Sequence, residues 1–235
     1  MENEKLSPGL NSQDFINAWG KTGYTEDFSG YQSEHKSQVV SELSKYYNSN
    51  HTCLEVGCGA GLWTSEFLSP NFKKVIALDI LPKNEVALSK RNLSNVNYIE
   101  LENKDYNCTG VEDSSVDFVF SFGVFCHLPN SAVETYINSI YNKLKPGGKA
   151  LIMLADFFRH FKYSARHFDG EESLMLDYEL QNKYREFDTF GGWFWNDSET
   201  ISKILRNTRF NFYADVSPDR FRDCLMFLKK RKKFV

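Results

Sequence analysis

The segment Cys53-Leu-Glu-Val-Gly-Cys-Gly-Ala-Gly-Leu-Trp-Thr64 decides the fold class of this 235-residue chain. It opens as a short apolar strand that ends at Val56 and continues into three glycines at alternating positions, Gly57, Gly59 and Gly61. An amphipathic run, Leu62 to Leu68, follows directly. Glycines let a backbone turn sharply and approach a ligand closely, and the N–H groups of the next helix then point at that ligand. The segment therefore predicts a strand, a ligand-binding loop and a helix.

A second strand, Lys74 to Leu78, ends in Asp79, 18 residues after Gly61. An acidic residue at the tip of the second strand of a βαβ unit is placed to accept hydrogen bonds from two ribose hydroxyls. The third glycine comes one residue too early for the dinucleotide fingerprint G-x-G-x-x-G, and the carboxylate of Glu55 would repel a pyrophosphate and attract a cation. No G-x-x-x-x-G-K-[ST] motif occurs, which excludes a P-loop site. The glycines taken alone also fit a structural turn.

The pattern E-x-G-x-G-x-G followed by Asp79 resembles the class I S-adenosylmethionine (SAM)-dependent methyltransferases, whose cofactor carries a sulfonium and an α-amino group but no phosphate. Further segments follow in the family's order through residues 50–155: a strand over Val96–Leu101, a fourth strand within Ser115–Pro129, a helix over Ser131–Leu144 and a turn into the fifth strand within Leu144–Ile152. The resemblance implies an α/β fold with helices on both faces of a seven-stranded, mostly parallel sheet in the order 3-2-1-4-5-7-6. Its antiparallel hairpin would be formed by Phe210–Val216 and Asp223–Lys229.

The resemblance also implies SAM as the cofactor. It places Glu55 near the positive charge of the cofactor, Asp79 at the ribose and Asp105 near the adenine amino group. The full set of residues expected to contact SAM is Trp19, Glu55, Gly57, Gly59, Gly61, Asp79, Ile80, Asp105, Tyr106 and Ser121.

Methyl transfer from SAM is a single in-line displacement, so the protein mainly aligns the acceptor and controls its protonation. An alcohol acceptor must lose a proton, and His127, just after the fourth strand, is the first candidate for the base, with His160 and His167 as alternatives. His127 also fits a structural place in the pocket wall. No [ND]-P-P-[YF] motif follows the fourth strand, which argues against methylation of adenine or glutamine.

The expected organisation is an N-terminal arm, residues 1–50, and a methyltransferase domain, residues 51–235, with a lid insertion at about 155–195. In this family the arm and the insertion cover the active site and select the acceptor. Here both segments are rich in aromatic residues. These aromatic residues also fit a purely structural role in the packing of a lid. A helix is expected after the insertion, with Asn196 as its cap. Acceptor contacts are expected from Tyr24, His127, Arg159, His160, Trp193 and Trp195.

Composition agrees with one α/β domain, with 41% hydrophobic residues and five cysteines without a C-x-x-C pair. The absence of a leader and of any 18-residue apolar run predicts a cytoplasmic protein without a membrane span. No metal site is expected, because Asp156 and His160 supply only two ligands.

The formal net charge is −3, and five of the 28 basic residues lie in the tail Lys229–Lys233. The remaining 23 basic residues face 31 acidic ones, which disfavours a nucleic-acid partner. The tail fits a solvated strand end best, with a nuclear localisation patch or an anionic-membrane contact as alternatives.

These observations predict a SAM-dependent methyltransferase for a small or mid-sized acceptor. O-methylation of a sugar, a sugar nucleotide or a glycan end is the first hypothesis, because of the aromatic lid and the acidic body. N-methylation of a small amine, held by Trp193 and Trp195, is the alternative. A non-catalytic SAM-binding scaffold is the third, although a scaffold would not need the intact Glu55, glycines, Asp79 and Asp105.

Overall fold

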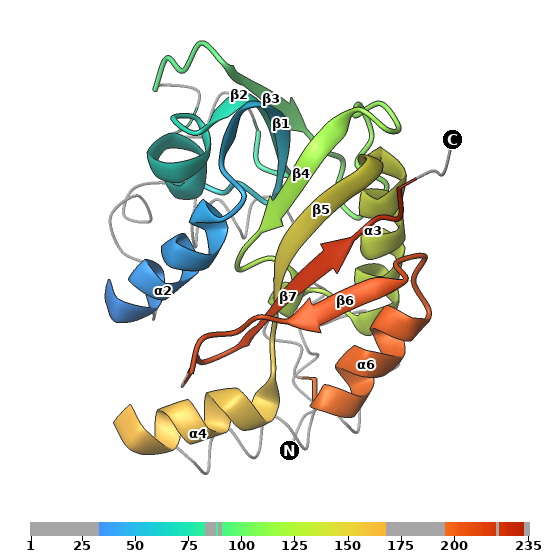
Figure 1. The fold of residues 1–235 in the computed structure, drawn as a ribbon. Helices are drawn as coiled ribbons and strands as arrows, with labels where there is room; N and C mark the ends of the chain where they lie inside the picture. Colours follow the sequence, from blue (N-terminus) through green and yellow to red (C-terminus); the bar gives the residue numbers. More distant parts are fainter. Residues whose placement is uncertain (1–32, 83–87, 89–90, 168–195, 220, 233–235) are drawn as a thin grey trace, which may run out of the picture.

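A seven-stranded sheet forms the centre of the molecule (Figure 1). The computed structural model describes residues 33–82, 88, 91–167, 196–219 and 221–232. The strand order is β3-β2-β1-β4-β5-β7-β6, and only the pairs that include β7 are antiparallel. This order and this mixed direction confirm the expected sheet. The strands are β1 (Asn48–Val56), β2 (Phe72–Asp79), β3 (Val96–Glu100), β4 (Val116–Ser121), β5 (Leu144–Leu154), β6 (Phe212–Asp215) and β7 (Cys224–Lys229).

Helices cover both faces of the sheet, as expected. On one face lie α3 (Asn130–Lys143) and α6 (Ser198–Arg206), and on the other lie α2 (Ser33–Ser44), the π-helix η2 (Thr64–Leu68) and the start of α4 (Phe157–His167) (Figure 1). A short 3₁₀ helix, η4 (Phe125–His127), connects β4 to α3. The run Lys83–Asn92, expected to be helical, lies mostly outside the described residues.

The two faces have separate apolar cores because successive strand residues point to opposite sides of a sheet. In β5, Ala150, Ile152 and Leu154 pack with α3 and α6, whereas Leu151 and Met153 pack with α2 and η2. All five side chains are buried. The near-continuous apolar sequence of β5 therefore reflects burial on both faces.

The parallel strands end at one edge of the sheet, where ligands bind in proteins of this architecture. The chain reverses its winding direction between β1 and β4, which are hydrogen-bonded neighbours. At such a switch point the two connections leave in opposite directions and open a crevice. The glycine loop follows β1 directly, so it lies at this crevice.

Two local expectations were wrong. The run Lys145–Gly148, expected as a turn before the fifth strand, is an irregularity inside β5: Val116 pairs with Leu144 and Phe118 pairs with Lys149. Helix α6 is capped by Asp197 and not by Asn196, because the Asp197 carboxylate accepts a 2.7 Å hydrogen bond from the backbone N–H of Thr200.

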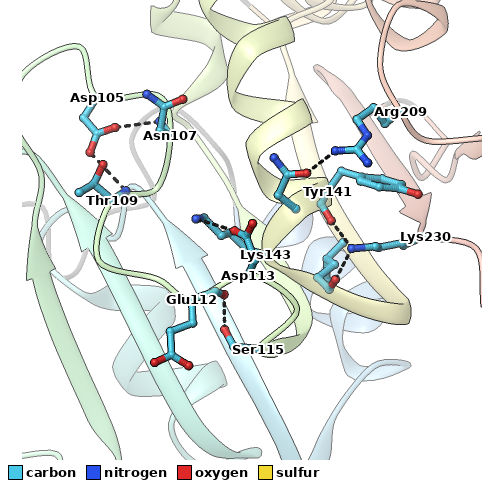
Figure 2. A network of polar contacts seen from close by, with 12 residues as sticks. Asp105, Asn107, Thr109, Glu112, Asp113, Ser115, Tyr141, Lys143, Arg209 and Lys230 are labelled. Atoms are coloured by element: carbon cyan, nitrogen blue, oxygen red, sulfur yellow. Dashed lines mark hydrogen bonds and ion pairs between the residues drawn. The ribbon is translucent and has the colours of Figure 1, made fainter.

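The second residue of the basic tail, Lys230, is partly buried and anchors the tail to the domain. The ammonium group of Lys230 donates hydrogen bonds to the carbonyl oxygens of Tyr141 (2.7 Å) and Leu144 (2.6 Å), at the C-terminal end of α3 (Figure 2). It also lies 4.6 Å from the centre of the Tyr141 ring, as does the guanidinium of Arg209. Lys230 therefore satisfies carbonyl groups that the end of a helix leaves unpaired. The expectation of a solvated strand end did not include this contact.

Removing this ammonium group should lower the stability of the protein. We expect Lys230→Met, which keeps the apolar stem, to cost about 1.5–3 kcal/mol, the usual range for hydrogen bonds to a charged group. The matched control is Lys229→Met, because Lys229 is exposed at the end of β7. Urea unfolding of both variants measures the difference, and equal stabilities would show that the contacts of Lys230 contribute nothing.

Candidate functional site

Three left-handed glycines shape the loop after β1. The φ angles of Gly57, Gly59 and Gly61 are +71°, +50° and +86°, a region that L side chains rarely adopt. A Cβ on Gly57 would lie 2.0 Å from Val124 Cγ2, and one on Gly61 would lie 2.6 Å from Leu88 Cδ1. A Cβ on Gly59 would meet no atom within 4 Å. Gly57 and Gly61 are therefore required for packing, whereas Gly59 borders open space.

The carboxylate of Asp79 is attached to this loop. One oxygen accepts a 2.7 Å hydrogen bond from the backbone N–H of Gly59, and the other accepts a 3.1 Å bond from that of Leu81. Burial raises the pKa of Asp79, and these N–H donors act in the opposite direction. Each oxygen keeps a second lone pair, so both can still accept from the hydroxyls of a ligand.

Glu55 lies at the end of β1 with only 2% of its surface exposed. It accepts a hydrogen bond from the hydroxyl of Thr64, which is fully buried at the start of η2. The resulting side-chain link holds the helix against the strand. π-Helical turns such as η2 are rare and often occur at functional sites.

The other expected cofactor residues line the same edge. Asp105 follows β3 and accepts hydrogen bonds from the backbone N–H groups of Asn107 (2.8 Å) and Thr109 (3.3 Å), so it also shapes its own loop (Figure 2). Ile80 and Tyr106 are partly buried against the core that includes α3. The structure thus brings residues after β1, β2 and β3 to one edge.

Two expected residues come from the end of β4. The hydroxyl of Ser121 is buried and donates a 2.9 Å hydrogen bond to the carbonyl of Val56, so it joins the tips of β4 and β1. His127 is half-buried and ends η4. Val124, the residue directly before η4, lies against Gly57. The segment that carries His127 therefore packs against the glycine loop.

A second polar group lies beyond β5. Asp156, 3% exposed, accepts a 3.0 Å hydrogen bond from the backbone N–H of Arg159, whose side chain pairs with Asp215. Burial raises the pKa of Asp156 and lowers that of His160 to about 4. His160 is therefore a neutral imidazole at physiological pH.

The sequence reasoning missed a buried ion pair beside this group. The Nε of Arg222 lies 2.8 Å from an Asp223 oxygen, and their side chains are 7% and 0% exposed. Both residues enter β7, whose first residue, Cys224, pairs with Leu154 at the end of β5. The pair acts electrostatically on His160 and on the buried thiol of Cys126. The only signal in the sequence was a charged pair directly before an apolar strand.

Several expected contacts cannot be placed. The side chains of Trp19, Tyr24, His167, Trp193 and Trp195 lie outside the residues that the structure describes. Among the described side chains, no three His, Cys, Asp or Glu residues gather in a way that could hold a metal ion. The helices within the described ranges are too short or too polar to cross a membrane.

A comparison with protein families identifies the chain. Residues 28–213, most of the sheet and its helices, match a family model described as a methyltransferase domain. The chain belongs to this methyltransferase family. The glycine loop, Asp79 and the polar group after β5 are therefore parts of a methyltransferase domain.

Curated relatives of this methyltransferase domain carry one kind of name. The chain is 34% identical over 126 residues to phosphoethanolamine N-methyltransferase 1 of Triticum aestivum, a match that covers 51% of this chain and 24% of the wheat protein. It is 26% identical over 186 residues to phosphoethanolamine N-methyltransferase 2 of Caenorhabditis elegans, over 77% of this chain and 37% of that protein. The methyltransferase domain thus spans well under half the length of these relatives.

Solved structures share the fold. The N-methyltransferase NodS of Bradyrhizobium japonicum in complex with S-adenosylhomocysteine superposes with a TM-score of 0.58 at 17% identity, over 94% of this chain and 99% of that one. A SAM-dependent methyltransferase of Methanosarcina mazei also gives 0.58, at 16% identity and over 82% and 98% of the two chains. At such identities, the likeness extends to the architecture alone.

Proposed function

We propose that this protein transfers the methyl group of SAM to the nitrogen of a small amine. The main observation in favour of SAM binding is the hydrogen bond from the backbone N–H of Gly59 to the carboxylate of Asp79. This bond holds the carboxylate that would bind the ribose beside Gly59, the glycine of the loop that borders open space. Membership of the methyltransferase family and neighbours with bound S-adenosylhomocysteine support SAM as the ligand of this space.

The described residues fit this cofactor. Asp79 would bind the ribose hydroxyls, the Gly59 side of the loop would face the cofactor, and Glu55 would face its positive charge. Asp105 would accept from the adenine amino group with lone pairs that its own loop leaves unused. Bound SAM supplies a methyl group on a sulfonium, which is its own leaving group. Ile80, Tyr106, Gly61 and Ser121 would support these contacts as packing or backbone partners.

The acceptor is inferred from the relatives. Sugar O-methylation, the first hypothesis from the sequence, finds no support in the names of the curated relatives, which are N-methyltransferases of phosphoethanolamine. The alternative from the sequence, a small amine, agrees with them. We therefore propose a small primary or methylated amine, with phosphoethanolamine as the first compound to test.

The amine must be unprotonated to attack the methyl group, so a base near the acceptor would increase the rate. His160 is a poor candidate, because a pKa of about 4 makes it a weak base. His127 ends η4, and Val124, directly before η4, packs against Gly57 of the proposed cofactor loop. We propose His127 as the base.

His127→Ala should lower kcat by about 10²–10⁴-fold, the usual contribution of a positioned base, and leave SAM affinity within a few-fold. The control is His160→Ala, which should keep most of the turnover because His160 is not the proposed base. An equal loss of SAM binding and turnover in His127→Ala would place His127 in the pocket wall instead.

The division into an arm at 1–50, a domain at 51–235 and a lid at about 155–195 is also part of this proposal. The described ends of the lid support it, because the N–H of Phe157 donates a 2.7 Å hydrogen bond to the carbonyl of Asn196. Phe157 and Asn196, at the two described ends, therefore lie side by side. Tyr24, Arg159, Trp193 and Trp195 would contact the acceptor from these segments.

The test is methyl transfer from radiolabelled SAM to a panel of small amines, phosphoamines, sugars and phenols. The proposal expects product with phosphoethanolamine or a related amine, and none with sugars. Turnover of a sugar in the absence of any amine turnover would restore the O-methylation hypothesis. Tight binding of SAM without turnover of any class would support a scaffold.

A further inference from the structure

Glu55 is a buried carboxyl group that forms no ion pair with a cation of the described residues. Its only hydrogen bond from a described side chain comes from the hydroxyl of Thr64, and no described Lys, Arg or His forms an ion pair with it. It is 2% exposed, so water cannot solvate a negative charge there. A carboxylate in such a place is costly unless a positive charge arrives.

The groups that face Glu55 from the surrounding elements do not supply that charge. Asp79, from β2, is itself acidic and disfavours a second negative charge. Cys53, on the same strand, and Cys58, in the glycine loop, are thiols whose pKa values burial raises well above the ordinary one, so both stay neutral. Burial raises the pKa of Glu55 to about 8, the Thr64 hydrogen bond acts in the opposite direction, and Asp79 adds to the rise.

We propose that Glu55 carries a proton in the cofactor-free protein and loses it when SAM binds, so that its carboxylate forms only against a positively charged cofactor. This inference rests on the SAM-binding function proposed above. The O–H bond of the carboxyl group breaks, its electron pair stays on the carboxylate, and the proton passes to the solvent. No oxidant or reductant takes part.

Two consequences follow from this linkage. Because the SAM-bound state holds one proton fewer, raising the pH toward 8 should strengthen SAM binding, by up to about tenfold per pH unit. A neutral ligand that shares the adenosine part, 5′-methylthioadenosine, provides no charge to hold the carboxylate and should bind without proton release. Glu55 thus selects the ligand by its charge, in addition to its shape.

Calorimetric titration tests the coupling directly. SAM is titrated at about pH 6.5, where its own ammonium group is almost fully charged, in phosphate and in imidazole, which both buffer at this pH and differ in ionisation enthalpy. The wild-type protein should release about one proton per SAM bound and none with 5′-methylthioadenosine. Glu55→Gln should release none, and its SAM affinity should not vary with pH.

SAM binding without proton release, or equal release by Glu55→Gln, would overturn the inference and leave the proposed function standing. Absence of SAM binding by the wild-type protein would overturn the proposed function as well. Infrared spectroscopy of the wild-type protein gives a test that needs no variant: a protonated-carboxyl band should be present without cofactor and disappear on adding SAM. A band that SAM leaves unchanged would contradict the coupling.

Discussion

Asp223→Ala should cost about 3–5 kcal/mol of unfolding free energy, the usual cost of leaving one member of a buried ion pair without its partner. The carboxylate of Asp223 is fully buried, and its substitution removes the charge that lies 2.8 Å from the guanidinium of Arg222, whose side chain is 7% exposed. Such a loss is a large fraction of the stability of an ordinary domain. Urea unfolding of the variant measures it.

The control is an ion pair of similar length whose carboxylate is exposed. The amine of Lys143 lies 2.9 Å from Asp113, which is 68% exposed (Figure 2), so Asp113→Ala should cost at most about 1 kcal/mol. Arg222→Met combined with Asp223→Leu should recover most of the stability, because two apolar side chains need no partner. Equal losses for Asp223→Ala and Asp113→Ala would contradict the buried pair. A stable double variant without methyl transfer would show that the charges serve the acceptor side.

Gly59→Ala should weaken SAM binding by about 5- to 150-fold, which corresponds to the roughly 1–3 kcal/mol that an extra methyl group costs in a filled space. The new Cβ meets no protein atom within 4 Å, so it projects into the space proposed for the cofactor. The left-handed φ of +50° adds about 1–2 kcal/mol of strain to the folded protein.

Gly147→Ala is the control that separates backbone strain from steric obstruction of the cofactor. Gly147 has a φ of +84°, and its added Cβ would lie 3.0 Å from Cγ of the exposed Lys232 side chain, at the start of β5 and away from the proposed site. Both variants should lose similar stability in thermal unfolding, and only Gly59→Ala should lose SAM affinity. Wild-type affinity in Gly59→Ala would show that the cofactor does not pass this glycine.

The parts of the site that the sequence predicted are those set by local backbone geometry. Alternating glycines after an apolar strand require positive φ angles, and Gly57, Gly59 and Gly61 all have them. Asp79 was recognisable because it follows the second strand directly, and the structure attaches it to the same loop. The strand order was predicted from the resemblance to the methyltransferase family, because the motifs of that family occur along the chain in the expected order.

The parts that were missed depend on tertiary contacts. Arg222 and Asp223 are buried because β7 returns antiparallel beside β5, a long-range pairing that their own sequence does not encode. Asn196 and Asp197 are both good helix caps, and the bridge between Asp156 and Asn196 leaves the capping position to Asp197. Lys230 was read as part of a solvated tail because the end of α3 is distant in sequence.

The central claim is that SAM binds along the edge formed by the glycine loop and Asp79, and calorimetric titration of SAM into the wild-type protein and into Asp79→Ala tests it most directly. The wild-type protein should bind one SAM per chain. The variant loses the acceptor for the ribose hydroxyls and the bond that holds Gly59, so its affinity should fall by about 1–3 kcal/mol or more. Absence of binding by the wild-type protein, or an unchanged affinity in Asp79→Ala, would contradict the account.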